Sequence, residues 1–123
     1  MTGPESLLDE YTHRYLAHDA DGVTALCHCP FVAIREGNAI HLADPGAVRD
    51  HFDTVMDAYQ AAGYADFRAV ATDTRQLGDR AAFVTVRWHA LDTDGNVARD
   101  SETTYHVLAT ADGWRFLSYT NHF

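Results

Sequence analysis

The sequence predicts an α+β fold in which a curved, mixed or antiparallel sheet wraps around one long helix. Helical spacing of apolar residues dominates the first half of the chain, and about sixty residues with strand character follow. Two Asp-Gly pairs divide that second half as hairpin turns would. Helices first and strands afterwards is typical of layered α+β domains. With 123 residues, of which 46% are hydrophobic, residues 1–123 suffice for a single domain around one core.

A first amphipathic helix is expected near the N-terminus, because apolar side chains recur there every three or four residues. These are Leu7, Leu8, Tyr11, Tyr15 and Leu16. Ser6 stands where an N-cap would. A short second helix, which includes Val23, Leu26 and Cys27, is expected to end before Pro30, since proline disfavours helical geometry in the residue before it.

A strand over residues 31–34, a turn at Gly37-Asn38 and a short strand through Ile40 and Leu42 are expected next. Asp44-Pro45 then supplies an N-cap and a first-turn proline, which predicts a long third helix that continues until Gly63. Its apolar stripe consists of Val48, Phe52, Val55, Met56 and Tyr59.

The two Asp-Gly turns predict which side chains of the C-terminal strands share a face. A turn at Asp94-Gly95 pairs Trp88 with Ser101, and a turn centred on Asp112-Gly113 pairs Tyr105 with Thr120. Both registers place the same set of side chains on one face. The set is Trp88, Ser101, Thr103, Tyr105, Ser118, Thr120 and His122. A shift of one residue in either pairing would reverse the assignment.

The opposite face of these strands is predicted to be the outer one. There Arg87 falls opposite Glu102 and His89 opposite Asp100, and such pairs are typical of a solvated cross-strand network. The same face carries four large apolar residues. They are Phe83, Leu108, Leu117 and Tyr119. We expect this patch to form a two-fold homodimer interface.

Two segments of the chain resemble the nuclear-transport-factor-2-like (NTF2-like) superfamily, which includes the SnoaL-like polyketide cyclases and the ketosteroid isomerases. One is the run from Tyr11 to Leu26, which contains Asp21-Gly22-Val23-Thr24-Ala25-Leu26, and the other is Asp112-Gly113-Trp114-Arg115-Phe116. The resemblance implies a cone-shaped, cystatin-like α+β domain with an internal apolar pocket, usually in a homodimer.

Compared with the ketosteroid isomerases, Tyr11 falls where that family keeps its oxyanion-stabilising tyrosine, and Tyr105 where it keeps a protonated aspartic acid as second donor. A tyrosine can still donate a hydrogen bond there. Arg35 stands at the position of the general-base aspartate, with Glu36 adjacent. The resemblance therefore does not extend to steroid isomerisation.

The candidate site combines the predicted face with this resemblance. Tyr11 and Tyr105 would polarise a ligand carbonyl, and His122 would move a proton. The side chains expected to contact the ligand are Tyr15, Arg35, Phe52, Trp88, Thr103, Ser118 and Thr120. The structural alternative is that the aromatic residues only fill a core, that Arg35 is an exposed strand arginine and that His122 belongs to a frayed chain end.

Composition narrows the classes of function and partner. Eighteen acidic residues against nine basic ones give a net charge of −9, which disfavours nucleic acid and anionic membranes and leaves small neutral or cationic ligands. No Gly-rich phosphate loop or nucleophile-elbow serine occurs. Cys27-His28-Cys29 has no second cluster to complete a zinc tetrahedron, so we expect neither metal nor cofactor. The N-terminus lacks an export-signal pattern, which favours a cytoplasmic location.

Two functional hypotheses remain. The protein either performs cofactor-free isomerisation, cyclisation or dehydration on a small apolar ligand that carries oxygen functions, or it is a non-catalytic ligand-binding or dimerisation module. The enzyme hypothesis predicts a cavity of at least about 300 Å³ reached by Tyr105 and one titratable side chain.

Overall fold

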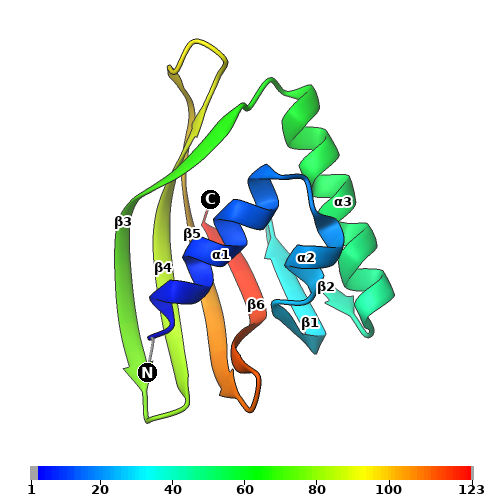
Figure 1. Ribbon diagram of the computed structural model, residues 1–123, viewed down its shortest axis with the longest axis vertical. Helices are drawn as coiled ribbons and strands as arrows, with labels where there is room; N and C mark the ends of the chain where they lie inside the picture. Colours follow the sequence, from blue (N-terminus) through cyan, green and yellow to red (C-terminus); the bar gives the residue numbers. More distant parts are fainter. Residues whose placement is uncertain (1–2, 123) are drawn as a thin grey trace.

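The computed structural model describes residues 3–122, and its elements follow the predicted order (Figure 1). The helices are α1 (Glu5–Leu16), α2 (Ala20–Thr24) and α3 (Pro45–Ala61). The strands are β1 (Cys27–Arg35), β2 (Asn38–Leu42), β3 (Asp66–Leu77), β4 (Ala81–Leu91), β5 (Val97–Thr110) and β6 (Gly113–His122).

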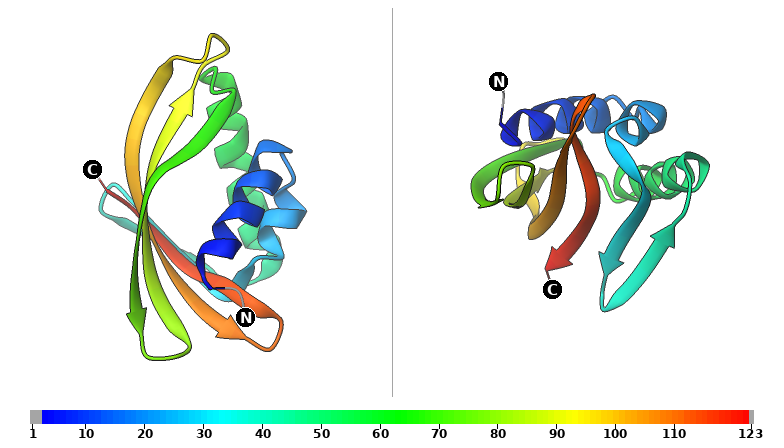
Figure 2. Two further views of the ribbon diagram at one scale, coloured as in Figure 1. Left: turned by 60° about the vertical axis from the view of Figure 1, so that its left-hand side comes forward. Right: turned by 90° about the horizontal axis from the view of Figure 1, so that it is seen from below.

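The six strands form one curved, unclosed mixed sheet in the order β2-β1-β6-β5-β4-β3. The β1–β6 pair is parallel and every other neighbouring pair is antiparallel. All three helices lie on the concave side of this sheet (Figure 2). The α+β class and the curved mixed sheet that the sequence predicts are confirmed.

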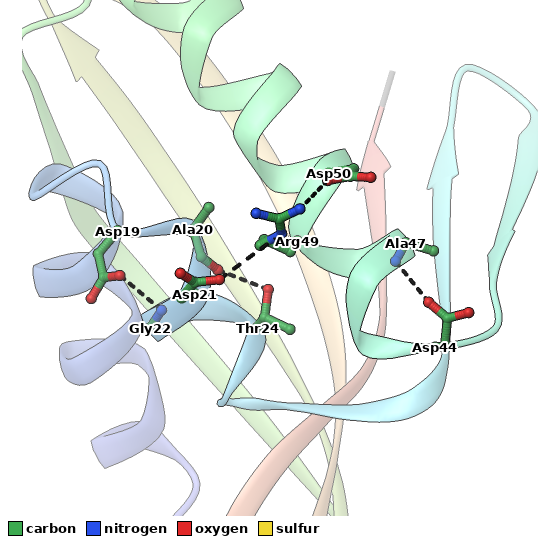
Figure 3. A network of polar contacts seen from close by, with 9 residues as sticks. All are labelled: Asp19, Ala20, Asp21, Gly22, Thr24, Asp44, Ala47, Arg49 and Asp50. Atoms are coloured by element: carbon green, nitrogen blue, oxygen red, sulfur yellow. Dashed lines mark hydrogen bonds and ion pairs between the residues drawn. The ribbon is translucent and has the colours of Figure 1, made fainter.

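Short polar contacts fix where the helices begin. Asp44 Oδ1 accepts the Ala47 backbone N–H at 2.9 Å, so the predicted cap and first-turn proline of α3 are confirmed. Asp19 caps α2 through Gly22 N–H, and Arg49 of α3 approaches Asp21 of α2 to 4.0 Å (Figure 3). These contacts dock α2 beside α3.

Two expectations for the N-terminal half were wrong. Ser6 is not the N-cap of α1, because the helix already begins at Glu5 and the Ser6 hydroxyl donates instead to the Gly3 carbonyl at 2.8 Å. The second helix ends at Thr24, and Cys27 already belongs to β1, where it pairs with Phe116 of β6. Pairing with β6 makes β1 start earlier than its apolar run indicates.

The β4–β5 register agrees with the prediction, whereas the β5–β6 register does not. Trp88 pairs with Ser101 and Val84 with Tyr105, as Asp94-Gly95 predicts. In the next hairpin, however, Tyr105 pairs with Tyr119 rather than with Thr120. The predicted inward orientation of Ser118, Thr120 and His122 was therefore wrong.

A β-bulge in β6 is the physical reason. The turn occupies residues 111–112 and is followed by Gly113 at φ 108, one residue earlier than predicted. This shift alone changes the pairing by two residues and leaves the faces unchanged. The pairing then jumps from Val107–Phe116 to His106–Ser118, and the extra residue, Leu117, reverses the faces of the rest of β6.

The core fills the space between the helices and the concave face of the sheet. Its most completely buried side chains are Phe31, Phe116, Val23, Val48, Val84, Val86 and Val107. Tyr119, predicted on the outer face, is only 6% exposed and packs against Phe31 and Phe52. None of the helices in residues 3–122 is both long and apolar enough to cross a lipid bilayer.

Candidate functional site

A partly open pocket lies between α1, α3 and the concave face of the sheet. Its volume is about 80 Å³, so the predicted volume of at least 300 Å³ was wrong. Packed aromatic rings occupy much of the cone. The side chains that line the pocket are Tyr11, Thr12, Tyr15, Arg35, Phe52, Val55, Tyr59, Phe67, Trp88, Ala90, Arg99, Ser101, Thr103, Tyr105, Tyr119 and Asn121.

The pocket brings together most of the residues that the sequence singles out. These are Tyr11, Tyr15, Arg35, Phe52, Trp88, Thr103 and Tyr105. His122 is exposed outside it, where Nε2 lies 2.7 Å from Thr104 Oγ1 and Nδ1 lies 3.5 Å from Glu102. The bulge that turned Ser118 and Thr120 outward also removed His122 from the pocket.

Two buried phenols form one wall of the pocket. The Tyr105 hydroxyl accepts the Trp88 indole N–H at 3.1 Å, and the rings of Tyr11 and Tyr105 lie 5.8 Å apart. Burial raises the pKa of both tyrosines well above the ordinary value, although hydrogen bonds from Trp88 and Tyr11 moderate the increase at Tyr105. Both phenols are therefore neutral near pH 7, and the proton of Tyr105 is available for a hydrogen bond to a ligand.

A second polar group lies at the opposite wall of the pocket, where β1 and β6 meet α3. The Tyr119 hydroxyl is 2.7 Å from His51 Nε2 and accepts a hydrogen bond from Arg35 Nη1 at 3.2 Å. Tyr119 lines the pocket and His51 lies behind it on α3. This arrangement connects a pocket-facing hydroxyl to an imidazole.

The pKa values at this group have identifiable causes. Burial, and then the charge of Arg35, lower the pKa of His51, so its imidazole is neutral near pH 7. Burial raises the pKa of the Tyr119 phenol, which the Arg35 hydrogen bond partly opposes. Burial is the largest single influence and disfavours the charge of Arg35, but the interactions with Tyr119 and Tyr59 together outweigh it and the pKa of Arg35 rises.

Among the residues of this site that sequence reasoning missed are His51, Arg99, Tyr119 and Asn121. Tyr119 and Asn121 face inward because of the bulge, which has no recognisable signal in the sequence. Asn121 accepts a hydrogen bond from the Thr103 hydroxyl at 3.0 Å. His51 could have been found, since it lies three residues after Val48 and so next to the apolar stripe of α3.

One group of metal-type ligand atoms occurs within residues 3–122, and it is outside the pocket. His18 Nε2 lies 2.8 Å from Asp57 and 3.9 Å from Asp53, with all three side chains exposed. Ordinary surface ion pairing accounts for this group. The pocket itself contains phenols, arginines, amides and hydroxyls, which are not a donor set that metals prefer.

Fold and site together define a small cone-shaped α+β protein of the NTF2-like class, with a polar-tipped aromatic pocket inside the cone. The chain belongs to the family described as NTF2-like protein (DUF6841), whose model matches residues 4–123. A search of curated proteins found no match.

Solved structures share this fold at low sequence identity. A candidate ketosteroid isomerase from Shewanella frigidimarina has a TM-score of 0.76 and 12% identity, over 98% of this chain and 95% of that one. A candidate dehydratase of the NTF2-like family from Streptomyces avermitilis has a TM-score of 0.72 and 16% identity, over 95% and 90%. A domain of unknown function with a cystatin-like fold from Nostoc punctiforme has a TM-score of 0.71 and 16% identity, over 94% and 72%. At these identities the likeness concerns the fold alone.

Proposed function

We propose that the pocket binds a small apolar compound with one or two oxygen functions and catalyses cofactor-free acid–base chemistry on it, namely isomerisation, cyclisation or dehydration. The observation that carries this proposal is the Tyr119–His51 contact of 2.7 Å, because it couples a hydroxyl in the pocket to a neutral base. The solved structures described as a candidate isomerase and a candidate dehydratase lend general support.

The proton would move in two linked transfers. As a C–H or O–H bond of the ligand breaks, its proton goes to the Tyr119 oxygen while the Tyr119 proton goes to His51 Nε2. The electron pair of the broken bond moves toward the ligand oxygen. The reverse transfers return a proton to another atom of the ligand, and His51 becomes neutral again. Burial near Arg35 keeps the imidazole unprotonated between turnovers.

The developing negative charge on the ligand oxygen requires hydrogen-bond donors. Tyr105 is the best placed, because its oxygen already accepts the Trp88 N–H and its own proton remains available to the ligand. Tyr11, at a ring distance of 5.8 Å, donates a hydrogen bond to the Tyr105 hydroxyl and so strengthens it as a donor. A preorganised donor of this kind is worth about 3 kcal/mol in a transition state.

Deuterium exchange tests the catalytic proposal without knowledge of the natural substrate. Small enolisable ketones and aldehydes are incubated with the protein in heavy water, and loss of the α-proton signal is followed by NMR. We expect exchange above the buffer rate, reduced at least about 100-fold in Tyr119→Phe and in His51→Gln. Tyr64→Phe is the matched control, because no hydrogen bond of the Tyr64 hydroxyl is found within residues 3–122. Exchange at the buffer rate across the panel would exclude the catalytic proposal.

The second candidate function is a non-catalytic ligand-binding or dimerisation module. The pocket volume of about 80 Å³ favours it, because sites for drug-sized ligands measure roughly 300 Å³ or more. We also propose a two-fold homodimer through the outer face of the sheet. Phe83 is 40% exposed there and stacks on His106 at 4.9 Å, with Leu108 and Leu117 half-buried on the neighbouring strands.

A further inference from the structure

The pocket has the opposite charge from the protein as a whole. The chain carries eighteen acidic residues and nine arginines, yet the described pocket lining contains two arginines, Arg35 and Arg99, and no Asp or Glu. The net charge of −9 predicted neutral or cationic ligands. The local charge predicts an anion instead, because a partly enclosed site interacts mainly with the charges that line it.

Neither arginine has an acidic partner within the described part of the chain. Within residues 3–122, no carboxylate oxygen lies within 4.0 Å of either guanidinium group. Arg35 hydrogen-bonds to the Tyr119 phenol and interacts electrostatically with the Tyr59 phenol, and Arg99 lies over the Tyr59 ring with its Cζ 5.7 Å from the ring centre. The arginines that do form ion pairs are Arg14, Arg49, Arg68 and Arg87, all outside the pocket.

Tyr59 places the two guanidinium groups near each other. It projects from α3, with Arg35 of β1 at its hydroxyl and Arg99 of β5 over its ring face. Two like charges beside one half-buried ring repel each other, and nothing in the described lining neutralises them. An anion bound between them would remove this repulsion and accept hydrogen bonds from both.

The remaining walls indicate which anion fits. Aromatic side chains from α1, α3 and the four strands β3 to β6 form an apolar lining, so the ligand needs an apolar body as well as a charge. The volume of about 80 Å³ is well below the roughly 300 Å³ of sites for drug-sized ligands, so the ligand is small. A planar carboxylate matches the geometry of a guanidinium fork and is small enough, whereas a phosphate ester would also need room for a tetrahedral group.

We propose that this pocket takes a short-chain carboxylate, held through its oxygens by Arg35 and Arg99 with its apolar body against the aromatic walls. The inference rests on the proposed function, because it names the ligand class of the same pocket. It assigns a binding role to Arg99, and it gives Arg35 a second role beside its hydrogen bond to Tyr119.

Isobutyrate and isobutyramide test the proposal, because they share one shape and differ in charge. Binding to the whole protein is measured by NMR titration, following the indole N–H of Trp88 in the pocket wall. We expect isobutyrate to bind at least about tenfold more tightly than the amide. Raising the ionic strength to about 0.5 M should weaken the binding of isobutyrate and leave the binding of isobutyramide unchanged.

Three variants locate the effect. Arg35→Gln and Arg99→Gln should each lower the affinity for isobutyrate about tenfold without changing the affinity for isobutyramide. The control variant Arg80→Gln, in the exposed β3–β4 turn, should change neither affinity. If loss of the Tyr119 contact prevents Arg35→Gln from folding, Arg99→Gln carries the test, since its guanidinium lies over the Tyr59 ring and forms no ion pair within residues 3–122.

The outcomes separate this inference from the proposed function. Equal affinity for the two probes, or binding of the amide alone, would overturn the carboxylate assignment and leave the exchange experiment to decide catalysis. An equal loss of isobutyrate affinity in Arg80→Gln would show a general charge effect and would also overturn the carboxylate assignment. Binding of neither probe also overturns the carboxylate assignment.

Discussion

Replacing Tyr119 by phenylalanine removes one oxygen atom from the centre of the site and should measurably lower the stability of the protein. The ring remains, so its packing against Phe31 and Phe52 at centroid distances of 6.0 and 6.1 Å is kept. What is lost is the acceptor for Arg35 Nη1 at 3.2 Å and the partner of His51 Nε2 at 2.7 Å. The change therefore isolates two hydrogen bonds from the hydrophobic contribution.

The expected magnitude follows from these two bonds. A hydrogen bond to a charged group contributes about 1.5–3 kcal/mol and a neutral one about 1 kcal/mol. Arg35 and His51 are only half-buried, so water replaces part of what each loses. We expect Tyr119→Phe to reduce the free energy of unfolding by about 1–2 kcal/mol.

Urea unfolding followed by tryptophan fluorescence measures this loss, with the midpoint lowered and the slope unchanged. Tyr64→Phe, which removes the same atom from a phenol outside the pocket, should lie within about 0.5 kcal/mol of the wild type. The double variant Tyr119→Phe/His51→Gln should be less destabilised than the sum of the single changes, because both disrupt the same contact. A Tyr119→Phe protein as stable as the wild type would refute the reasoning.

The remaining predictions concern pH, helix capping and assembly. Because the pKa of His51 is lowered on folding, the unfolded chain binds its proton first, so stability should fall as the pH drops below about 6.5. Urea unfolding of His51→Gln should show a smaller decrease in the free energy of unfolding between about pH 7.5 and 5.5 than the wild type shows. An equal decrease in both proteins would contradict this. Asp44→Ala should cost about 1 kcal/mol in the same assay through loss of the α3 cap, and a neutral result would argue against that cap. In size exclusion the wild type should elute as a dimer and Leu117→Arg as a monomer, while Leu16→Arg on α1 stays dimeric; a monomeric wild type would disprove the homodimer.

The sequence alone determined the order of the elements and half of the site. The Asp44-Pro45 start of α3 and the Asp94-Gly95 hairpin are local signals, since each depends on the conformations that a few adjacent residues prefer. The hairpin register placed Trp88 and Tyr105 correctly on the concave face. Such local preferences are encoded within a short stretch of chain and can be read without the fold.

Only the tertiary structure decided which residues of β6 face the pocket and which charged side chains line it. The extra residue at Leu117 turned Tyr119 inward and His122 outward, and a bulge is set by how the whole sheet curves rather than by nearby residue types. Arg35 and Arg99 lie on strands far apart in the sequence and approach one Tyr59 ring only through the fold. The net charge of the chain is an average, whereas the sign of a pocket depends on which few side chains the topology brings together.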